Sequence, residues 1–161
     1  MLDKKIEAFI RDRAGDVGHS GRTFYDHLIG VYDLLESIGA AERVCLAGLF
    51  HSIYGTNAFR HAAVSLDERH DVAKLIGYPA ERLAYIFCSC ARPKALIEAV
   101  DRGTPYFVLD RRNGKRIGLT RDELDDLLEI EDANLLEQNS LKMMPQVTAA
   151  RLLLMEVVEC P

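Results

Sequence analysis

The sequence has few cysteines and no long apolar run. It contains four cysteines in 161 residues, and no two of them form a C-x-x-C pair, so a zinc site built from thiolates is not expected. No apolar stretch approaches the roughly 18 residues that a membrane-spanning helix needs. The first residues also lack the basic and then apolar order of a signal peptide. These absences predict a cytoplasmic protein without a membrane partner, with Cys45, Cys88 and Cys90 as small core residues.

The sequence also lacks an excess of basic residues. Lysine and arginine total 20 against 25 acidic residues, which gives a formal net charge of −5, and no basic stripe is present. A nucleic-acid partner is therefore not expected. Hydrophobic residues make up 48% and charged residues of both signs 28%, a composition typical of a globular chain. We expect one domain over residues 1–161 that acts on a small molecule, and the sequence leaves a homodimer open.

Apolar residues recur at helical spacing along most of the chain. The expected helices are 3–13, 22–38, 41–52, 65–76, 79–90, 93–101, 120–138 and 145–158. Residues 105–119 alone have strand character, and their Asn113-Gly114 dipeptide favours the tight turn of a hairpin. The sequence thus predicts an all-α helical bundle with one short β-hairpin.

Two histidines lie on apolar helix faces. His27 lies between Phe24 and Val31 at helical spacing, and His51 ends the apolar segment 46–50. Burying an imidazole is unfavourable unless the ring is hydrogen-bonded or binds something. A single such histidine favours a core residue bonded to a carbonyl or hydroxyl. Two of them, 24 residues apart on neighbouring antiparallel helices, favour a shared ligand such as a divalent metal.

The segments Tyr25-Asp26-His27-Leu28 and Ala47-Gly48-Leu49-Phe50-His51-Ser52 resemble the first two motifs of the HD-domain superfamily. The resemblance covers about residues 20–140. It implies an HD-domain-like bundle with His27 and His51 as metal ligands. Where that superfamily has an aspartate ligand, this chain has Ser52, whose hydroxyl is a poor ligand. The resemblance therefore identifies the chain as a variant subgroup, and we expect one divalent ion (Fe, Mn, Ni or Zn) per chain.

The superfamily takes its last ligand, an aspartate, from a late helix. By motif match, Asp132 corresponds best to that ligand. By helical periodicity alone, Glu131 and Asn134 point inward as well. A salt-bridged helix surface is an equally good explanation of these three polar residues, so the ligand stays open.

Three further histidines are candidates to replace the missing ligand: His19, His61 and His70. His19 and His70 are slightly favoured, because the loop of His19 precedes the His27 helix and His70 shares a face with Leu66 and Ala73. The loop around Arg22 opens a helix, where an anion is favourable, although an ordinary N-cap explains the loop too. We expect His19, Arg22 and Tyr25 to serve the reaction, and His27, His51, Asp132 and His70 to bind the metal.

Three functions from different classes fit these residues. A metal-dependent hydrolase of a small phosphorylated or anionic substrate follows from the chemistry of most of the HD superfamily. A histidine-rich iron oxygenase is the first alternative. A degenerate, non-catalytic fold that binds a small ligand or a protein partner is the second, and Ser52 is its main support.

Overall fold

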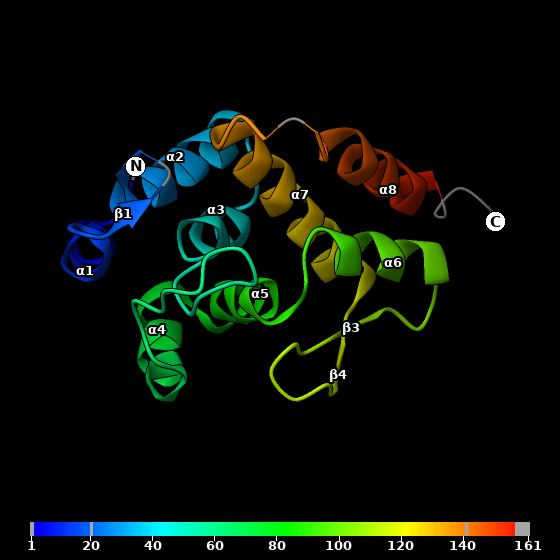
Figure 1. Ribbon diagram of the computed structural model, residues 1–161, viewed down its shortest axis with the longest axis horizontal. Coiled ribbons are helices and arrows are strands. Elements are labelled where there is room, and N and C mark those ends of the chain that lie inside the picture. The colour runs from blue at the N-terminus through cyan, green and yellow to red at the C-terminus, as the bar shows by residue number, and fades with distance from the viewer. Residues whose placement is uncertain (1, 20, 141, 157–161) are drawn as a thin grey trace.

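The computed structural model describes residues 2–19, 21–140 and 142–156 (Figure 1). These residues form eight α-helices, four short strands and one 3-10 turn. In chain order they are α1 (Lys4–Ala14), β1 (Gly18–His19), β2 (Arg22–Thr23), α2 (Phe24–Ser37), α3 (Glu42–Leu49), η1 (Leu66–Glu68), α4 (Arg69–Ile76), α5 (Tyr78–Ser89), α6 (Lys94–Arg102), β3 (Phe107–Leu109), β4 (Arg116–Gly118), α7 (Arg121–Glu137) and α8 (Met144–Glu156).

The predicted all-α fold and the hairpin at Asn113-Gly114 are confirmed, since β3 and β4 pair antiparallel around that turn. The structure adds a second antiparallel pair, β1–β2, which the sequence does not predict. Gly21 lies between these two strands with a φ of +87°, a conformation that favours glycine and permits the tight reversal. No helix of the described ranges is both long and apolar enough to cross a bilayer.

Side-chain caps fix where the functional helices begin. Thr23 caps α2, where its hydroxyl accepts from the backbone N–H of Asp26 and the Asp26 carboxylate accepts from the Thr23 N–H. Thr120 and Glu123 form the same reciprocal pair at the start of α7. Such caps satisfy backbone donors that have no partner inside the helix. They therefore set the register of the two helices that carry the candidate site.

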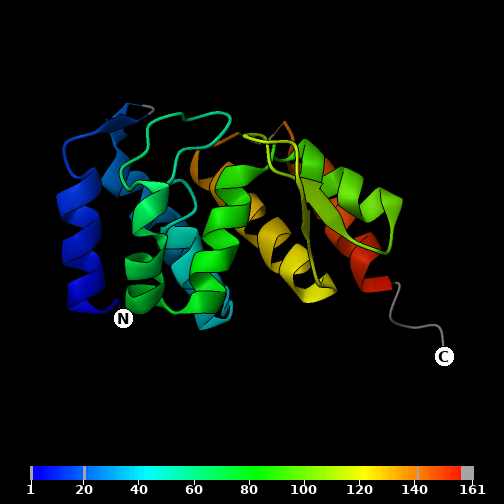
Figure 2. The same cartoon turned by 90° about the horizontal axis from the view of Figure 1, so that it is seen from below.

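Helix α3 lies at the centre of the fold, in contact with α2, α5 and α7 (Figure 1). Its position explains why the segment is apolar nearly all round. Gly48 lets α2 approach closely, because a Cβ atom there would lie 2.3 Å from Leu35 Cδ1. Figure 2 shows α1 and α4 at one end of the molecule and α6 and α8 at the other. The buried residues of all these helices form one continuous core.

Candidate functional site

The candidate site is built around two imidazoles in the core. His27 lies in α2 and His51 in the turn after α3, and the two residues are 1% and 0% exposed, respectively. Their Nε2 atoms lie 3.0 Å apart, and the ring planes meet at 75°. This confirms that the two histidines lie within reach of one shared ligand.

The Nδ1 atoms fix how the two rings are protonated. His51 Nδ1 lies 2.6 Å from the carbonyl oxygen of Gly48, which can only accept, so this nitrogen carries the proton. His27 Nδ1 lies 2.5 Å from Glu137 Oε2, and a carboxylate accepts in the same way. In neutral rings the proton-free Nε2 atoms therefore face each other. Their contact is attractive only when a proton or a cation lies between them.

Glu137 ends α7 and connects the pair to Arg22. Its side chain is only 4% exposed. Arg22 contacts the Oε1 atom and also donates to the Glu137 backbone oxygen at 3.2 Å. Gly30, one turn after His27, makes room for the carboxylate, because a Cβ atom there would lie 2.7 Å from Oε1. The positive charge of Arg22 favours the ionised carboxylate that orients His27.

A polar stripe along α7 faces the same region. Gln138 Nε2 lies 3.4 Å from His27 Nε2 and donates to Asn134 Oδ1 at 3.3 Å. Asn134 and Glu131, one and two turns earlier, are 1% and 0% exposed. The inward direction that helical periodicity predicts for both is confirmed.

Glu131 forms a buried ion pair with Arg92. Nη1 of Arg92 lies 3.1 and 3.2 Å from the two carboxylate oxygens, and the guanidinium carbon lies 4.4 Å from the centre of the Phe87 ring. Burial raises the pKa of Glu131 above its ordinary value, while the charge of Arg92 opposes that shift. The same Phe87 ring packs edge-on against His51. The ion pair thus adjoins the residues that support the histidine pair.

Asp132 lies on another side of α7. Its carboxylate accepts a hydrogen bond from Thr148 of α8 at 3.4 Å, and burial raises its pKa. It lines a pocket of about 200 Å³ together with Leu34 of α2 and Leu136 of α7. Since α-helical neighbours two positions apart point in different directions, Asp132 and Asn134 cannot both face the histidine pair. The structure brings the Asn134 face to the histidines.

The structure does not bring His70 or His61 to the pair. His70 is exposed on α4, where its Nδ1 lies 3.0 Å from the Tyr78 hydroxyl. In Figure 1, α3 and α5 lie between α4 and the helices α2 and α7. His61 is exposed in the segment after α3 and packs against the rings of Phe24 and Phe59. The His19 backbone lies in β1, and its side chain falls outside the described part of the structure.

Tyr25 and Arg22 have contacts other than the expected ones. The Tyr25 hydroxyl accepts from Arg11 at 2.7 Å and donates to Glu7 at 3.1 Å, so it faces α1. Arg22 lies against Glu137 at the opening of α2, and Thr23 supplies the N-cap of that helix. The capping explanation of this loop is therefore confirmed.

The cysteines of the described chain are buried thiols in the core. Burial raises the pKa of Cys88 to about 11 and that of Cys90 to about 12, so both stay protonated near neutral pH. Cys45 is buried as well, which confirms all three as core residues, and Cys160 lies outside the described residues. No group of three or more His, Cys, Asp or Glu side chains that could hold a metal occurs among the residues that the structure places.

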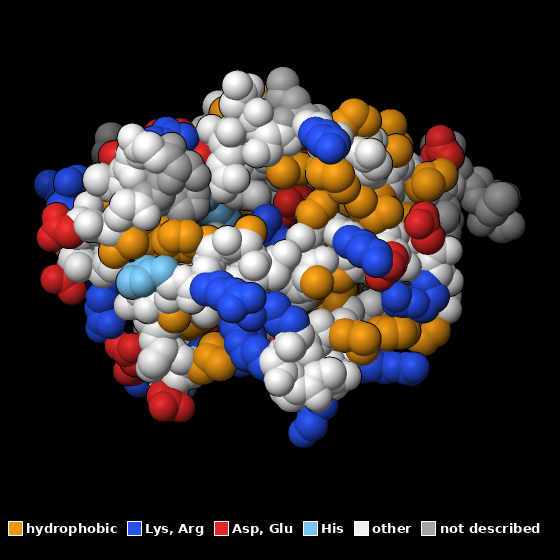
Figure 3. Space-filling model, viewed as in Figure 1, with side chains coloured by type: hydrophobic (Ala, Val, Ile, Leu, Met, Phe, Trp, Pro, Cys, Tyr) orange, Lys and Arg blue, Asp and Glu red, His pale blue; other side chains and the backbone are white. Residues whose placement is uncertain are grey.

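Two surface features set this site in context. Figure 3 shows a hollow near the centre of one face, with histidine, basic and acidic side chains at its bottom.

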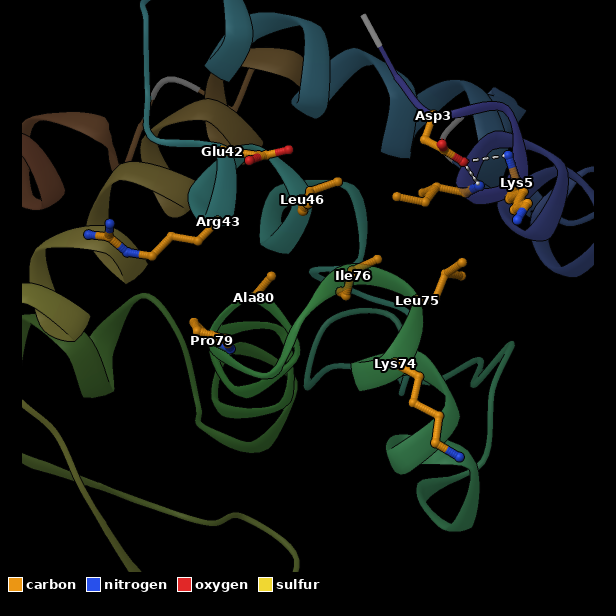
Figure 4. A pocket seen from close by; sticks show the side chains of 11 residues that line it. Asp3, Lys5, Glu42, Arg43, Leu46, Lys74, Leu75, Ile76, Pro79 and Ala80 are labelled. Carbon is orange, nitrogen blue, oxygen red and sulfur yellow. Dashed lines mark hydrogen bonds between the residues drawn. The ribbon is translucent and has the colours of Figure 1, made fainter.

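A separate pocket of about 600 Å³ lies between α1, α3, α4 and α5 (Figure 4). Its middle is apolar, Asp3 caps α1, and Arg43 pairs with Asp126 of α7 at 2.8 Å. Asp3 and Arg43 of this pocket thus already have structural roles.

Sequence reasoning missed Glu137, Gln138 and Arg92. Gln138 follows Asn134 by four residues and Glu131 by seven, so the inward stripe of α7 could have been extended to it. Arg92 precedes a proline after an apolar helix, and nothing in that local pattern indicates burial. The role of Glu137 depends on where the end of α7 lies against α2, which periodicity does not specify.

Comparison with known proteins gives one match. A family model described as a domain of unknown function, DUF6817, matches residues 9–92. No curated protein and no solved structure matches this chain. The matched segment holds His27, His51 and Arg92, while α7 with Glu137 lies outside it. The match does not identify an HD domain, so that resemblance stays a prediction. Since the matched segment is slightly more than half of the chain, the chain belongs to the DUF6817 family.

Proposed function

We propose that this chain is a metal-dependent hydrolase of a small phosphorylated or anionic substrate, with one divalent ion held by His27 and His51. The observation that carries the proposal is the 3.0 Å approach of the two Nε2 atoms. Two atoms at that separation can both lie at the roughly 2.0–2.1 Å that a zinc–imidazole bond requires. Both Nδ1 protons are already directed to oxygen acceptors, an arrangement typical of metal-binding histidines.

The donor set fits one ion better than two. Ser52 is buried next to His51 and supplies no carboxylate to bridge a second ion. Catalytic zinc sites usually have three protein ligands and one open position. With two protein ligands here, the remaining positions of the ion would be left to water and substrate. A bound divalent ion would lower the pKa of a water molecule and polarise a phosphoryl oxygen.

The chain's own residues would orient the reacting groups. Glu137 and the Gly48 carbonyl hold the two rings in one orientation. Arg22 acts through Glu137, so it is a positioning residue in this proposal and does not itself contact the substrate. Gln138 and Asn134 offer amide groups for hydrogen bonds to a substrate that reaches His27.

A metal-free ligand-binding protein is the second candidate. A nitrogen–nitrogen distance of 3.0 Å also suits a proton shared between the rings. In addition, Arg22 and Arg92 already balance the charges of Glu137 and Glu131. An activity that requires a bound metal would favour the hydrolase over the metal-free ligand-binding protein.

An activity assay tests the hydrolase. The full chain is incubated with p-nitrophenyl phosphate and bis-p-nitrophenyl phosphate in the presence of Mn²⁺, Fe²⁺, Ni²⁺ or Zn²⁺. Release of p-nitrophenol is expected with at least one of these metals, and His27→Ala should lower it at least about 100-fold, since one of two ligands is lost. His70→Ala is the matched control and should keep the parent rate. Equal rates for the parent and His27→Ala, or with excess chelator, would contradict hydrolysis at this site.

Gly30→Ala tests the support of His27 without changing a polar residue. The added methyl group would lie within 3.2 Å of three Glu137 side-chain atoms and must displace that carboxylate. We expect metal affinity to fall about tenfold, although alanine favours the helix itself. Titration with a competing chelator gives the affinity. Gly118→Ala, which would meet no atom within 4 Å, serves as the control. Unchanged affinity in Gly30→Ala would show that Glu137 does not tune His27.

A further inference from the structure

A further pocket, whose lining includes neither His27 nor His51, is lined by arginines. It has a volume of about 450 Å³ and lies between α6 and the β3–β4 hairpin. Arg102, Arg111 and Arg116 line it, against one acidic residue, Glu98. Glu98 lies 3.5 Å from Lys94, so its charge is offset outside the arginine cluster. The pocket is therefore strongly positive in a chain whose formal net charge is −5.

None of these three arginines has a carboxylate partner among the residues that the structure describes. Nine other arginines of the described chain do, including Arg43, Arg69 and Arg151. Arg111 donates to the carbonyl oxygens of Cys88 and Gly55, and Arg102 to that of Phe107. A carbonyl oxygen accepts a hydrogen bond but does not neutralise the guanidinium charge. The pocket thus keeps three positive charges for an external anion.

Stacking on Phe107 holds two of the guanidinium groups in place. The guanidinium carbons of Arg102 and Arg116 lie 4.0 and 4.4 Å from the centre of the Phe107 ring. Arginine groups that are fixed before binding lose less freedom when an anion arrives. The space-filling view shows hydrophobic side chains flanked by basic ones over α6 and the hairpin (Figure 3).

We propose that this pocket binds a phosphorylated small molecule. A phosphate monoester carries about two negative charges and three acceptor oxygens, which suit several convergent guanidinium groups better than one carboxylate does. The apolar part of the lining, Ala95, Val108 and Leu109, suits the organic part of such a ligand. The volume lies within the range of small-molecule sites. The proposal does not depend on the hydrolase, because no residue of the histidine site lines this pocket.

Calorimetric titration with inorganic pyrophosphate tests the proposal. The buffer contains a chelator, so that no ion at the histidine pair can attract the probe. Saturable binding to the full chain is expected. Arg116→Gln should weaken it about tenfold through loss of one charge-assisted contact. Among the described residues the Arg116 side chain stacks on Phe107 and makes no hydrogen bond, so this variant should fold. Arg11→Gln, an exposed arginine of α1, is the matched control and should change the affinity less than twofold.

Three outcomes would overturn the proposal. The first is absence of pyrophosphate binding to the parent at low ionic strength. The second is equal affinity in the parent and Arg116→Gln, with circular dichroism showing both folded. The third is tighter binding of a glutamate-rich peptide than of pyrophosphate, which would make the pocket a docking site for an acidic protein segment. Stronger binding of pyrophosphate than of sulfate at equal ionic strength would support it.

Discussion

Replacement of Arg92 with methionine is expected to lower the free energy of unfolding by about 3–5 kcal/mol near neutral pH. The substitution leaves Glu131, whose side chain is 0% exposed, as a buried charge without its cation. Chemical denaturation monitored by circular dichroism measures this loss in the free energy of unfolding. Arg92→Met combined with Glu131→Leu should recover most of it, because a buried ion pair can often be replaced by apolar residues without loss.

The same variant should be less destabilised in acid. Burial already raises the pKa of Glu131, and removal of Arg92 raises it further. A carboxyl whose pKa is higher in the folded state favours folding when protonated. Its contribution is fully present below the ordinary pKa and is lost as pH rises through the raised one. The difference between Arg92→Met and the parent should therefore shrink as pH falls toward the ordinary carboxyl range. A difference below about 1 kcal/mol at neutral pH, or one independent of pH, would contradict the ion-pair account.

Glu137→Gln is expected to weaken metal binding about 10- to 100-fold. A neutral amide cannot hold the Nδ1 proton of His27 as a carboxylate does, and it also loses the pairing with Arg22. Metal affinity from chelator competition gives the size of the effect. Glu129→Gln removes a charge from the same helix, where Glu129 pairs with Arg151. This control should leave the affinity within about twofold of the parent.

A spectroscopic readout separates positioning from general stability. Nitrogen-15 NMR of the histidine rings reports which nitrogen carries the proton. In the parent, His27 should carry it on Nδ1, and Glu137→Gln should mix the two tautomers while His51 stays unchanged, since its Nδ1 donates to a backbone carbonyl. Should Glu137→Gln leave both the tautomer of His27 and the metal affinity as they are, Glu137 has no role in the site.

The helices and their starts could be predicted from local patterns. Capping boxes at Ser65-Glu68 and Thr120-Glu123 are local features, and the structure has both. The approach of His27 and His51 could also be predicted, because neighbouring helices with inward imidazoles leave few alternatives. The partners of these histidines could not. Glu137 follows His27 by 110 residues, so only the docking of α7 on α2 brings them together.

Residues 131–134 allow motif match and helical periodicity to be compared as predictors of which side chains face inward. Motif match selects Asp132, whereas helical periodicity selects Glu131 and Asn134 as inward residues. In the structure Asp132 contacts α8. Glu131 and Asn134 are buried on another side of α7, where Glu131 contacts Arg92 and Asn134 contacts Gln138. Periodicity reports the direction of a side chain, which burial then fixes. A motif spacing alone does not contain that information.

The metal content of the purified chain tests the central claim most directly. Protein isolated without chelator is analysed by mass spectrometry of its metals beside His51→Ala and Ser52→Asp. We predict close to one divalent ion per parent chain, at least tenfold less in His51→Ala, and equal or higher occupancy in Ser52→Asp, because a carboxylate is a better ligand than a hydroxyl. A parent that holds no metal after exposure to Mn²⁺, Fe²⁺, Ni²⁺ and Zn²⁺, together with an equally empty Ser52→Asp, would contradict the account.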